Sequence, residues 1–278
     1  MNYAYYNGRF SRYEDTVIPL TDRALFFGDG VYDAAVGTGG GIYRFHEHYE
    51  RLARGAKAVG LNFRLSEGEL LEILLELIGL SGLQSYFLYF HLSAAGEIRK
   101  HERNFLTATN LLATVKPWSM PTGAEAISVN TEEDIRHRLC NIKTLNLLPA
   151  VLASSRAVKS GCGECVFIKD GYVTECAHSN IFAVKNGRLI TPRAGRSVLS
   201  GITRRAIIKI AKSHGIDTRI GGLTRDELLS ADEAFVSSTS RICTRIDRIN
   251  GCKIGEKSVI FYQIFQLLSK DYIEEIQN

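Results

Sequence analysis

Alternating and helical patterns of apolar residues predict strands and helices in the first part of the chain. The first ten residues alternate and meet a turn at Asn7-Gly8, a dipeptide typical of a two-residue β-hairpin. Apolar residues at helical spacing predict a helix over residues 47–58. A capping box formed by Ser66 and Glu69 predicts a second helix that starts at Glu67 and stops near Gly79. Strands are expected at residues 31–36, 42–45, 86–94 and 110–115.

A break in this pattern at residues 116–123 indicates two domains. The segment holds two of the five prolines and a glycine, which is typical of a linker. We expect a smaller N-terminal α/β domain at residues 1–116, a linker at 117–123 and a larger C-terminal domain at 124–278, to which the candidate lysine described below is assigned. Beyond the linker, strands are expected at 126–129, 164–169, 180–185, 188–191, 218–220 and 233–237, and helices at 146–159, 203–214, after Thr224 and at 258–276. Because strands and helices mix without strict alternation, the predicted fold class is α+β or mixed α/β.

Length and composition exclude several classes of protein. With 278 residues, an apolar fraction of 45% and a charged fraction of 23%, the chain is typical of a globular enzyme of one or two domains. The net charge is +4 and no block of like charges occurs, so binding to nucleic acid or to a membrane is not expected. The N-terminus lacks a basic segment followed by an apolar stretch, and no uncharged apolar run reaches the roughly 18 residues of a membrane span. We therefore expect a cytoplasmic protein.

Two motifs that suggest metal or nucleotide binding lack the context they need. Cys162 and Cys165 have the spacing of a metal or redox pair, but no second cysteine pair or His-x-His motif accompanies them. The six cysteines are therefore expected to be free thiols in a reducing compartment, and no metal site is expected. The run Gly37–Gly41 is followed by Ile42 and a strand, whereas a dinucleotide site needs another glycine and a helix. It predicts a flexible hairpin turn.

Three blocks in the second half supply complementary chemical groups. Lys143 precedes a predicted helix and has many apolar neighbours in sequence, which favours the neutral amine that attacks an aldehyde. Glu175 ends a predicted strand and offers a carboxylate suited to a pyridinium nitrogen. Gly201 opens a helix whose first N–H groups suit a phosphate. Together these groups could hold pyridoxal 5'-phosphate (PLP) covalently. Taken singly, each block is more often a snorkelling lysine, a turn glutamate or an ordinary helix cap.

Two further segments carry anion-binding groups. Residues 237–240, Ser-Ser-Thr-Ser, follow a strand and offer hydroxyl and N–H groups for the same phosphate. Arg99 and His101 lie in a predicted loop, and a guanidinium group matches a carboxylate through two hydrogen bonds. Taken alone, the first segment is more often an ordinary turn and the second a solvated loop.

In combination, these motifs resemble those of the class IV, fold-type IV PLP-dependent aminotransferases, and most closely those of bacterial D-amino-acid transaminases. The resemblance covers nearly the whole chain, from Asn7-Gly8 and residues 27–32 (Phe-Gly-Asp-Gly-Val-Tyr) to residues 236–239 (Val-Ser-Ser-Thr). The segment Asn141-Ile-Lys-Thr-Leu-Asn146 matches the lysine motif of the family closely.

The resemblance implies a role for each matched residue. Lys143 is the lysine that forms the Schiff base and carries the proton, and Glu175 is the partner of the pyridine nitrogen. The phosphate is expected to bind to Arg51, Ile202, Thr203, Ser238 and Thr239. Leu199 is expected to pack on the ring and Arg136 to approach the phenolic oxygen. The substrate α-carboxylate is expected to bind to Tyr32, Arg99 and His101. In the family the arginine and histidine come from the other subunit, which implies a homodimer.

The implied reaction is a ping-pong exchange of an amino group between an amino acid, of the D-alanine or D-glutamate type, and a 2-oxo acid. The chain departs from the family pattern at two places. Cys176-Ala177-His178 replaces glycine and small hydroxyl residues, and Ala34 and Val36 replace a bulkier residue and a lysine. These departures leave the preferred side chain of the substrate open.

Three alternatives share some of these features. Aminodeoxychorismate lyases and branched-chain L-amino-acid transaminases have the same fold and cofactor, but Arg99 and His101 argue against both. A non-catalytic PLP-binding protein is a more distant alternative, and the presence of both Lys143 and Glu175 argues against it.

Overall fold

The structure is a computed structural model that describes residues 2–96, 99–104, 108–255 and 258–277. The chain divides into two compact units, each with its own sheet. Unit 1 comprises Met1–Ser119, Ile142–Asn146 and Glu275–Asn278, and unit 2 comprises Met120–Asn141 and Leu147–Glu274. The mixture of strands and helices confirms the predicted fold class.

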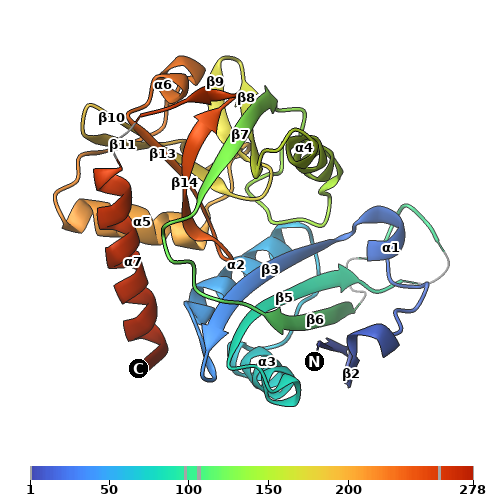
Figure 1. The fold of residues 1–278 in the computed structure, drawn as a ribbon. Coiled ribbons are helices and arrows are strands. Elements are labelled where there is room, and N and C mark those ends of the chain that lie inside the picture. Colours follow the sequence, from blue (N-terminus) through green and yellow to red (C-terminus); the bar gives the residue numbers. More distant parts are fainter. Residues whose placement is uncertain (1, 97–98, 105–107, 256–257, 278) are drawn as a thin grey trace. The chain divides into compact units, whose positions relative to one another are not determined.

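Unit 1 is built on an antiparallel sheet with the strand order β2-β1-β6-β5-β3-β4, which we call the N-terminal sheet (Figure 1). Its strands are β1 (Tyr3–Tyr6), β2 (Arg9–Arg12), β3 (Gly30–Thr38), β4 (Gly41–Ile42), β5 (Ser85–Ala94) and β6 (Thr109–Pro117). The helical segments are η1 (Tyr13–Asp15), α1 (Ala24–Phe27), α2 (Phe45–Ala58) and α3 (Glu67–Ser81).

Glycine and asparagine set the two hairpins of this sheet where the sequence predicted them. Asn7 and Gly8 both have positive φ, 45° and 91°, as a two-residue turn between β1 and β2 requires. Gly39 and Gly40 do the same between β3 and β4. The strand expected at residues 42–45 is wrong beyond Ile42, because Arg44 turns into the left-handed region and α2 begins at Phe45.

Helix α3 begins as predicted but ends later. The capping box between Ser66 and Glu69 is present at its N-terminus. The expected stop near Gly79 is wrong: the helix runs to Ser81 and ends at Gly82, whose φ is +67°. Leu77, Ile78 and Ser81 are buried on this last turn. We infer that their burial outweighs the ~1 kcal/mol that glycine costs inside a helix.

The two faces of the N-terminal sheet differ in chemistry. One face is apolar: Leu88, Phe90 and Leu92 of β5 pack with residues of α2 and α3 such as Leu52 and Leu74. Since side chains alternate along a strand, β3 sends Val31, Asp33 and Ala35 toward this core and Tyr32 to the other face. Tyr32 is paired with His91 across the strands and contacts the ring of Tyr89.

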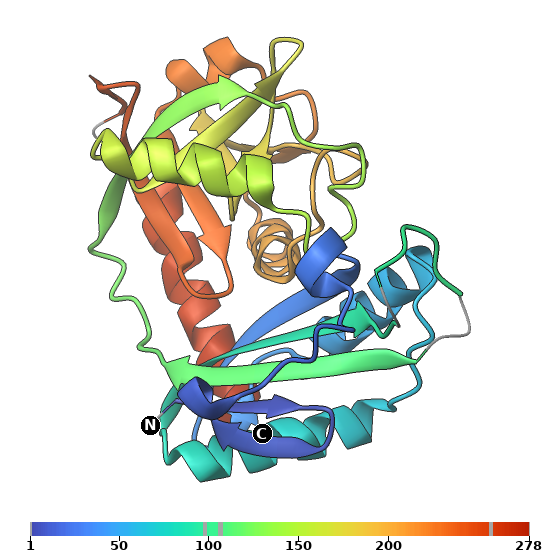
Figure 2. The same cartoon turned by 90° about the vertical axis from the view of Figure 1, so that its right-hand side faces the viewer.

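Unit 2 is built on a mixed sheet with the strand order β12-β11-β10-β13-β14-β7-β8-β9, which we call the C-terminal sheet; β15 pairs with β14. Its strands are β7 (Ala126–Glu133), β8 (Glu164–Lys169), β9 (Tyr172–Cys176), β10 (Asn180–Lys185), β11 (Arg188–Thr191), β12 (Thr218–Ile220), β13 (Glu233–Ser238), β14 (Ile242–Ile249) and β15 (Cys252–Lys253). Its helices are α4 (Leu148–Lys159), α5 (Ile202–Ser213), α6 (Arg225–Leu229) and α7 (Val259–Gln277). Figure 2 shows α4 beside β7 and β8.

Strand β14 is the largest element that the sequence pattern missed. It pairs with β13 on one side and β7 on the other. The pairing with β7 shifts between Ile246 and Arg248, which is the mark of a β-bulge. The bulge breaks the alternation of buried and exposed residues, so Ile246 and Ile249 are both buried although they lie three positions apart.

The described helices have no membrane-spanning candidate: each is too short or too polar to cross a bilayer. The six cysteines are free, and five of them are buried or half-buried while Cys252 is exposed.

Candidate active site

Lys143 lies on a segment that is fastened to β3 of unit 1. The backbone N–H of Tyr32 donates to the Lys143 carbonyl at 2.8 Å, and that of Leu145 donates to the Gly30 carbonyl at 3.1 Å. A side chain at Gly30 would collide with the Leu92 carbonyl and with Leu145. These bonds explain why residues 142–146 belong to unit 1, although the sequence placed the lysine in the C-terminal domain.

The amine of Lys143 rests on an aromatic ring. Its Nζ lies 4.2 Å from the centroid of the Tyr32 ring, within the range of a cation–π contact. Within the described residues, no hydrogen bond or ion pair to this Nζ is found. Of its apolar neighbours in sequence, Leu139 and Leu148 are 52% and 68% exposed.

Arg51 belongs to a buried group of charges on the core side of the same strand. Its Nε and Nη2 donate to the two carboxylate oxygens of Asp33 at 2.8 and 2.7 Å, and His48 Nδ1 lies 2.7 Å from Asp33 Oδ1. Burial would raise the pKa of Asp33, but Arg51 and His48 outweigh it, so the pKa lies below its usual range. Burial lowers the pKa of His48, and the charge of Lys143 adds to this effect. The charge of Arg51 is therefore held in one orientation.

Arg99 and His101 lie together in unit 1 but apart from Tyr32. The Arg99 guanidinium and the His101 ring lie 5.0 and 5.3 Å from the centroid of the Phe27 ring. In the described part of the chain, no hydrogen bond, ion pair or ring contact joins Tyr32 to either residue. One copy of the chain thus pairs Tyr32 with Lys143 and leaves Arg99 and His101 as a separate basic pair.

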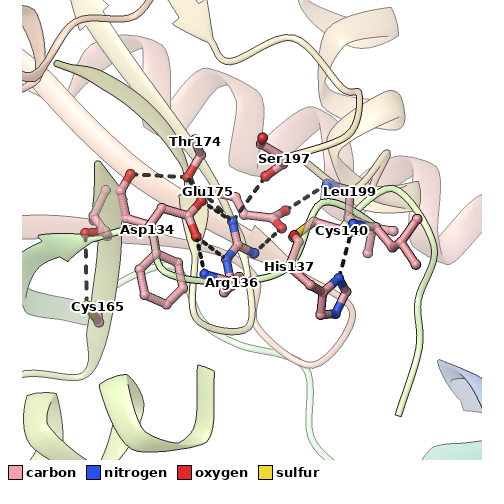
Figure 3. Close-up of polar contacts among 12 residues, drawn as sticks. Asp134, Arg136, His137, Cys140, Cys165, Thr174, Glu175, Ser197 and Leu199 are labelled. Atoms are coloured by element: carbon pink, nitrogen blue, oxygen red, sulfur yellow. Dashed lines mark hydrogen bonds and ion pairs between the residues drawn. The ribbon is translucent and has the colours of Figure 1, made fainter. Parts of the chain in front are cut away.

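Glu175 is the centre of a hydrogen-bonded group in unit 2 (Figure 3). Its Oε1 accepts from Arg136 Nη1 at 2.5 Å, and its Oε2 accepts from the Leu199 backbone N–H at 2.9 Å and from Asn180 Nδ2 at 3.3 Å. Glu175 and Asn180 are buried. The carboxylate is therefore fixed in position.

Arg136 is held on both sides. Asp134 accepts from its Nε and Nη2 at 2.9 and 2.8 Å, and the Ser197 carbonyl accepts from Nη2 at 3.0 Å. Burial would lower the pKa of Arg136, but the carboxylates of Asp134 and Glu175 outweigh it and raise the pKa. A guanidinium carries five N–H bonds, and the described contacts of Arg136 use four. The remaining N–H, on Nη1, suits an oxygen such as the predicted phenolic one.

The start of α5 is suited to a phosphate group. Gly201 caps the helix without a side-chain hydrogen bond, so the N–H groups of the first turn, which includes Ile202 and Thr203, need another acceptor. Any side chain at Gly201 would collide with Asn180 Oδ1.

Two buried side chains of unit 2 point to the same ligand chemistry. Ser237 pairs with Asn180 across β13 and β10, and its buried Oγ has no hydrogen-bond partner among the described residues. Arg204, in the first turn of α5 and 4% exposed, donates to Thr191 Oγ1 and the Pro192 carbonyl, and no carboxylate pairs with it in the described part of the chain. An orphaned hydroxyl and a buried cation beside uncapped N–H groups fit a phosphate.

Two further predicted phosphate residues follow β13. Ser238 accepts the backbone N–H of Arg241 at 3.3 Å, which closes the turn into β14. Thr239 lies in the same turn. Together with Ser237, they form one polar loop of unit 2.

The unusual His178 turns toward a different carboxylate from the one predicted to face the cofactor. Its Nδ1 lies 3.0 Å from Oε2 of Glu164, whose side chain is fully buried. Ser179 Oγ donates to the same oxygen at 2.6 Å. Since His178 and Ser179 precede Asn180, this contact fastens the turn between β9 and β10.

Sequence reasoning missed several residues of these two groups. Asp33 and His48 were not recognised, although His48 and Arg51 have the three-residue spacing that places both on one face of a helix. Asp134 and Asn180 were not assigned a role either. Asp134 accepts from Thr174, 40 residues away in sequence, which the pattern could not predict, whereas Asn180 contacts Glu175 only five residues away.

Comparison with known proteins gives one consistent family. The model of the family "amino-transferase class IV" matches residues 30–249. The D-alanine aminotransferase of Bacillus licheniformis is 31% identical over 90% of this chain and 89% of its own length. The branched-chain amino acid aminotransferase from Escherichia coli has a similar structure, with a TM-score of 0.88 and 28% identity over 99% of this chain and 95% of that one. A putative 4-amino-4-deoxychorismate lyase from Legionella pneumophila, at 23% identity over 93% of this chain and 97% of that one, shares the fold with a TM-score of 0.85.

Proposed function

The chain belongs to the class IV aminotransferases and is a PLP-dependent enzyme, and from that premise we propose that it transfers the amino group of a D-amino acid to a 2-oxo acid. D-Alanine and D-glutamate are the proposed type of substrate. The observation that carries the proposal is the basic pair of Arg99 and His101 in a chain whose relatives include D-alanine aminotransferases.

When bound, PLP supplies an aldehyde that captures the amino group and a pyridine ring that withdraws electrons from Cα. Lys143 supplies the amine that links to this aldehyde. Glu175 is proposed to face the pyridine nitrogen, Arg136 the phenolic oxygen and Leu199 the ring. The phosphate is assigned to Arg51, Ile202, Thr203, Ser238 and Thr239. The uncapped start of α5 and the orphaned hydroxyl of Ser237 support this assignment.

Lys143 is proposed to move the proton of the substrate Cα. Its contact with the Tyr32 ring supports this role, because an aromatic face attracts the amine without fixing its N–H groups. The amine can then turn from the ring to the substrate. A general base placed in this way contributes roughly 10²–10⁴-fold to a rate.

Glu175 is proposed to keep the pyridine nitrogen protonated. Its fixed carboxylate supports this role, because Arg136, Asn180 and the Leu199 N–H hold it before any ligand arrives. Preorganised charge of this kind does not have to be reoriented during the reaction.

The substrate α-carboxylate is assigned to Tyr32, Arg99 and His101, with the last two from a second copy of the chain. We propose a homodimer for this reason. Two observations support it: Tyr32 and the basic pair lack a described contact within one copy, and exposed apolar residues occur in the segment that ends with α1, whose Phe27 contacts the pair. The most exposed of these are Val17 (73%), Leu20 (77%) and Leu25 (51%).

A panel of D- and L-amino acids with pyruvate or 2-oxoglutarate tests this function, with both oxo acid products measured. We expect D-alanine or D-glutamate to give the highest kcat/KM. Arg99→Ala should raise the KM for D-alanine about ten- to a hundredfold, since a charged bidentate contact is lost.

Other outcomes of the panel identify the alternatives. Faster turnover of L-leucine or L-valine, with Arg99→Ala indifferent, would show a branched-chain transaminase. Release of pyruvate from aminodeoxychorismate without an acceptor would show a lyase.

A further inference from the structure

The segment that carries Arg99 and His101 is held by one buried arginine. Arg23 Nη1 donates to the Lys100 carbonyl at 2.6 Å and Nη2 donates to the His101 carbonyl at 2.8 Å. Nε donates to Asp29 at 2.8 Å, and Arg23 is only 8% exposed. The rigid fork of this guanidinium thus fixes the backbone on which both basic side chains stand.

The two basic side chains then share a single aromatic platform. The Arg23, Arg99 and His101 groups lie 4.6, 5.0 and 5.3 Å from the centroid of the Phe27 ring. A ring of this kind attracts guanidinium groups through its face. Arg99 and His101 therefore both contact the side chain of Phe27, which belongs to α1 and not to their own segment.

A second arginine fastens the far end of the segment. Arg103 Nε lies 3.2 Å from the same Asp29 oxygen that Arg23 contacts, and Arg103 donates to the carbonyls of Val59 and Gly60 at the end of α2. Two guanidinium groups thus contact one carboxylate, and the Arg99 guanidinium lies over the same Phe27 ring as that of Arg23. The excess of positive charge suits an anionic ligand.

We propose that Arg23 and Phe27 are positioning residues that order Arg99 and His101 for a substrate carboxylate. The inference rests on the proposed function, in which this pair binds the α-carboxylate. Long side chains lose conformational freedom when they bind a ligand, and ordering them beforehand reduces that cost. Phe27 and Arg23 thereby set the affinity for the carboxylate group without touching it.

Phe27→Leu tests the role of the Phe27 ring, since it keeps an apolar side chain and removes the ring. In the holoenzyme we expect the KM for D-alanine and the dissociation constant of propionate, an unreactive carboxylate followed by calorimetry, to rise about tenfold. The kcat, the visible absorbance of the bound cofactor and the melting temperature should stay at the values of Tyr13→Leu, a control at an exposed tyrosine of unit 1.

Arg23→Lys tests the hydrogen bonds of the Arg23 guanidinium, because lysine keeps the charge but cannot span the two carbonyls and Asp29. The same two constants should rise. In a background that carries both Arg99→Ala and His101→Ala, Phe27→Leu should have no further effect on either constant.

The outcomes separate the two hypotheses. Unchanged constants in both Phe27→Leu and Arg23→Lys, while Arg99→Ala weakens propionate, would overturn the positioning role and leave the proposed carboxylate site intact. Unchanged constants in Arg99→Ala itself would overturn the carboxylate site, and the positioning role with it.

Discussion

Lys143 and Glu175, the two residues assigned to the reacting amine and to the cofactor nitrogen, are held in opposite ways. In unit 1, the amine of Lys143 contacts the face of the Tyr32 ring, and its backbone is bonded to β3. In unit 2, both oxygens of Glu175 accept hydrogen bonds, and its partner Arg136 is itself held by Asp134.

This difference matches the work proposed for each residue. A proton carrier has to leave its resting place and return, so a non-directional contact with a ring suits it. A charge that stabilises the electron-withdrawing form of a ring acts best when it stays in place, and hydrogen bonds to both carboxylate oxygens keep Glu175 in place. Unit 1 therefore holds Lys143 through its backbone, whereas unit 2 holds Glu175 through its side chain.

The largest test of this comparison is Lys143→Ala. We expect transamination to fall by about 10⁴-fold, because the variant loses both the covalent link and the proton carrier. Borohydride should then fail to fix the cofactor to the chain, whereas it should do so in the wild type. Mass spectrometry of the intact protein measures this directly.

Lys169→Ala is the matched control, since Lys169 is a half-buried lysine at the end of β8. It should keep the covalent link and full turnover. Full turnover in Lys143→Ala would show that Lys143 does not supply the reacting amine.

Glu175→Gln tests the fixed side of the comparison. The variant should retain the cofactor but slow the first half-reaction roughly 10²–10³-fold, because the developing charge loses its preorganised partner. It also leaves Arg136 with one buried partner fewer, which should lower the free energy of unfolding by about 3 kcal/mol. Stopped-flow absorbance and chemical denaturation measure the two effects.

Arg51→Ala provides the contrast to Glu175→Gln. Its main effect should be weaker retention of the cofactor on dialysis, since a phosphate would lose a charged donor. If the two variants showed the same defect, the separate roles of nitrogen partner and phosphate partner would be wrong.

Local signals in the sequence were sufficient for much of the fold. The capping box at Ser66, the helix start after Thr224 and the hairpin turn at Asn7-Gly8 depend on residues close in sequence, and all three predictions are confirmed. The end of α3 and the presence of β14 depend on burial and on a bulge opposite another strand, and both were missed.

The candidate site shows the same division. The segment around Lys143 was recognisable by its motif, and the chain's place among class IV aminotransferases is confirmed. The roles of the individual residues stay predictions. Asp33 orients Arg51 from another element, and Arg136 contacts Glu175 from 39 residues away, so these pairings had no local signal. Asp134 and Asn180 lie within five residues of the side chains they contact, and their roles were missed.

Acid should distinguish the two units further, since unit 1 holds a buried imidazole and unit 2 holds paired carboxylates. Burial lowers the pKa of His91 to about 4, from an ordinary value of 6.5. Above pH 6.5 the imidazole is neutral in both folded and unfolded chains, so its full contribution to stability is present there. As the pH falls toward 4, His91 is protonated in the unfolded chain but stays neutral in the folded chain. The free energy of unfolding therefore falls by about 3 kcal/mol.

His91→Gln should remove this loss. Unfolding by urea at pH 7.5 and pH 4.5 should show a smaller drop in stability for the variant than for the wild type. Asp134 of unit 2 differs: burial would raise its pKa, but Arg136 lowers it below its ordinary 3.8, so its contribution is lost only in stronger acid. An equal acid response in the variant and the wild type would contradict the buried, neutral His91.

The smallest expected effect concerns the turn that leads from Glu175 to Asn180. His178→Ser removes the contact with the buried Glu164 and leaves the bond from Ser179 in place. One lost hydrogen bond should lower the free energy of unfolding by about 1 kcal/mol. The rate of the half-reaction should change less than twofold, because Glu175 keeps Arg136, Asn180 and the Leu199 N–H. Ser160→Ala, which loses a hydrogen bond at the end of α4, is a control of similar size. A drop in rate of tenfold or more for His178→Ser alone would show that the carboxylate depends on this turn, and the picture of an independently fixed Glu175 would fail.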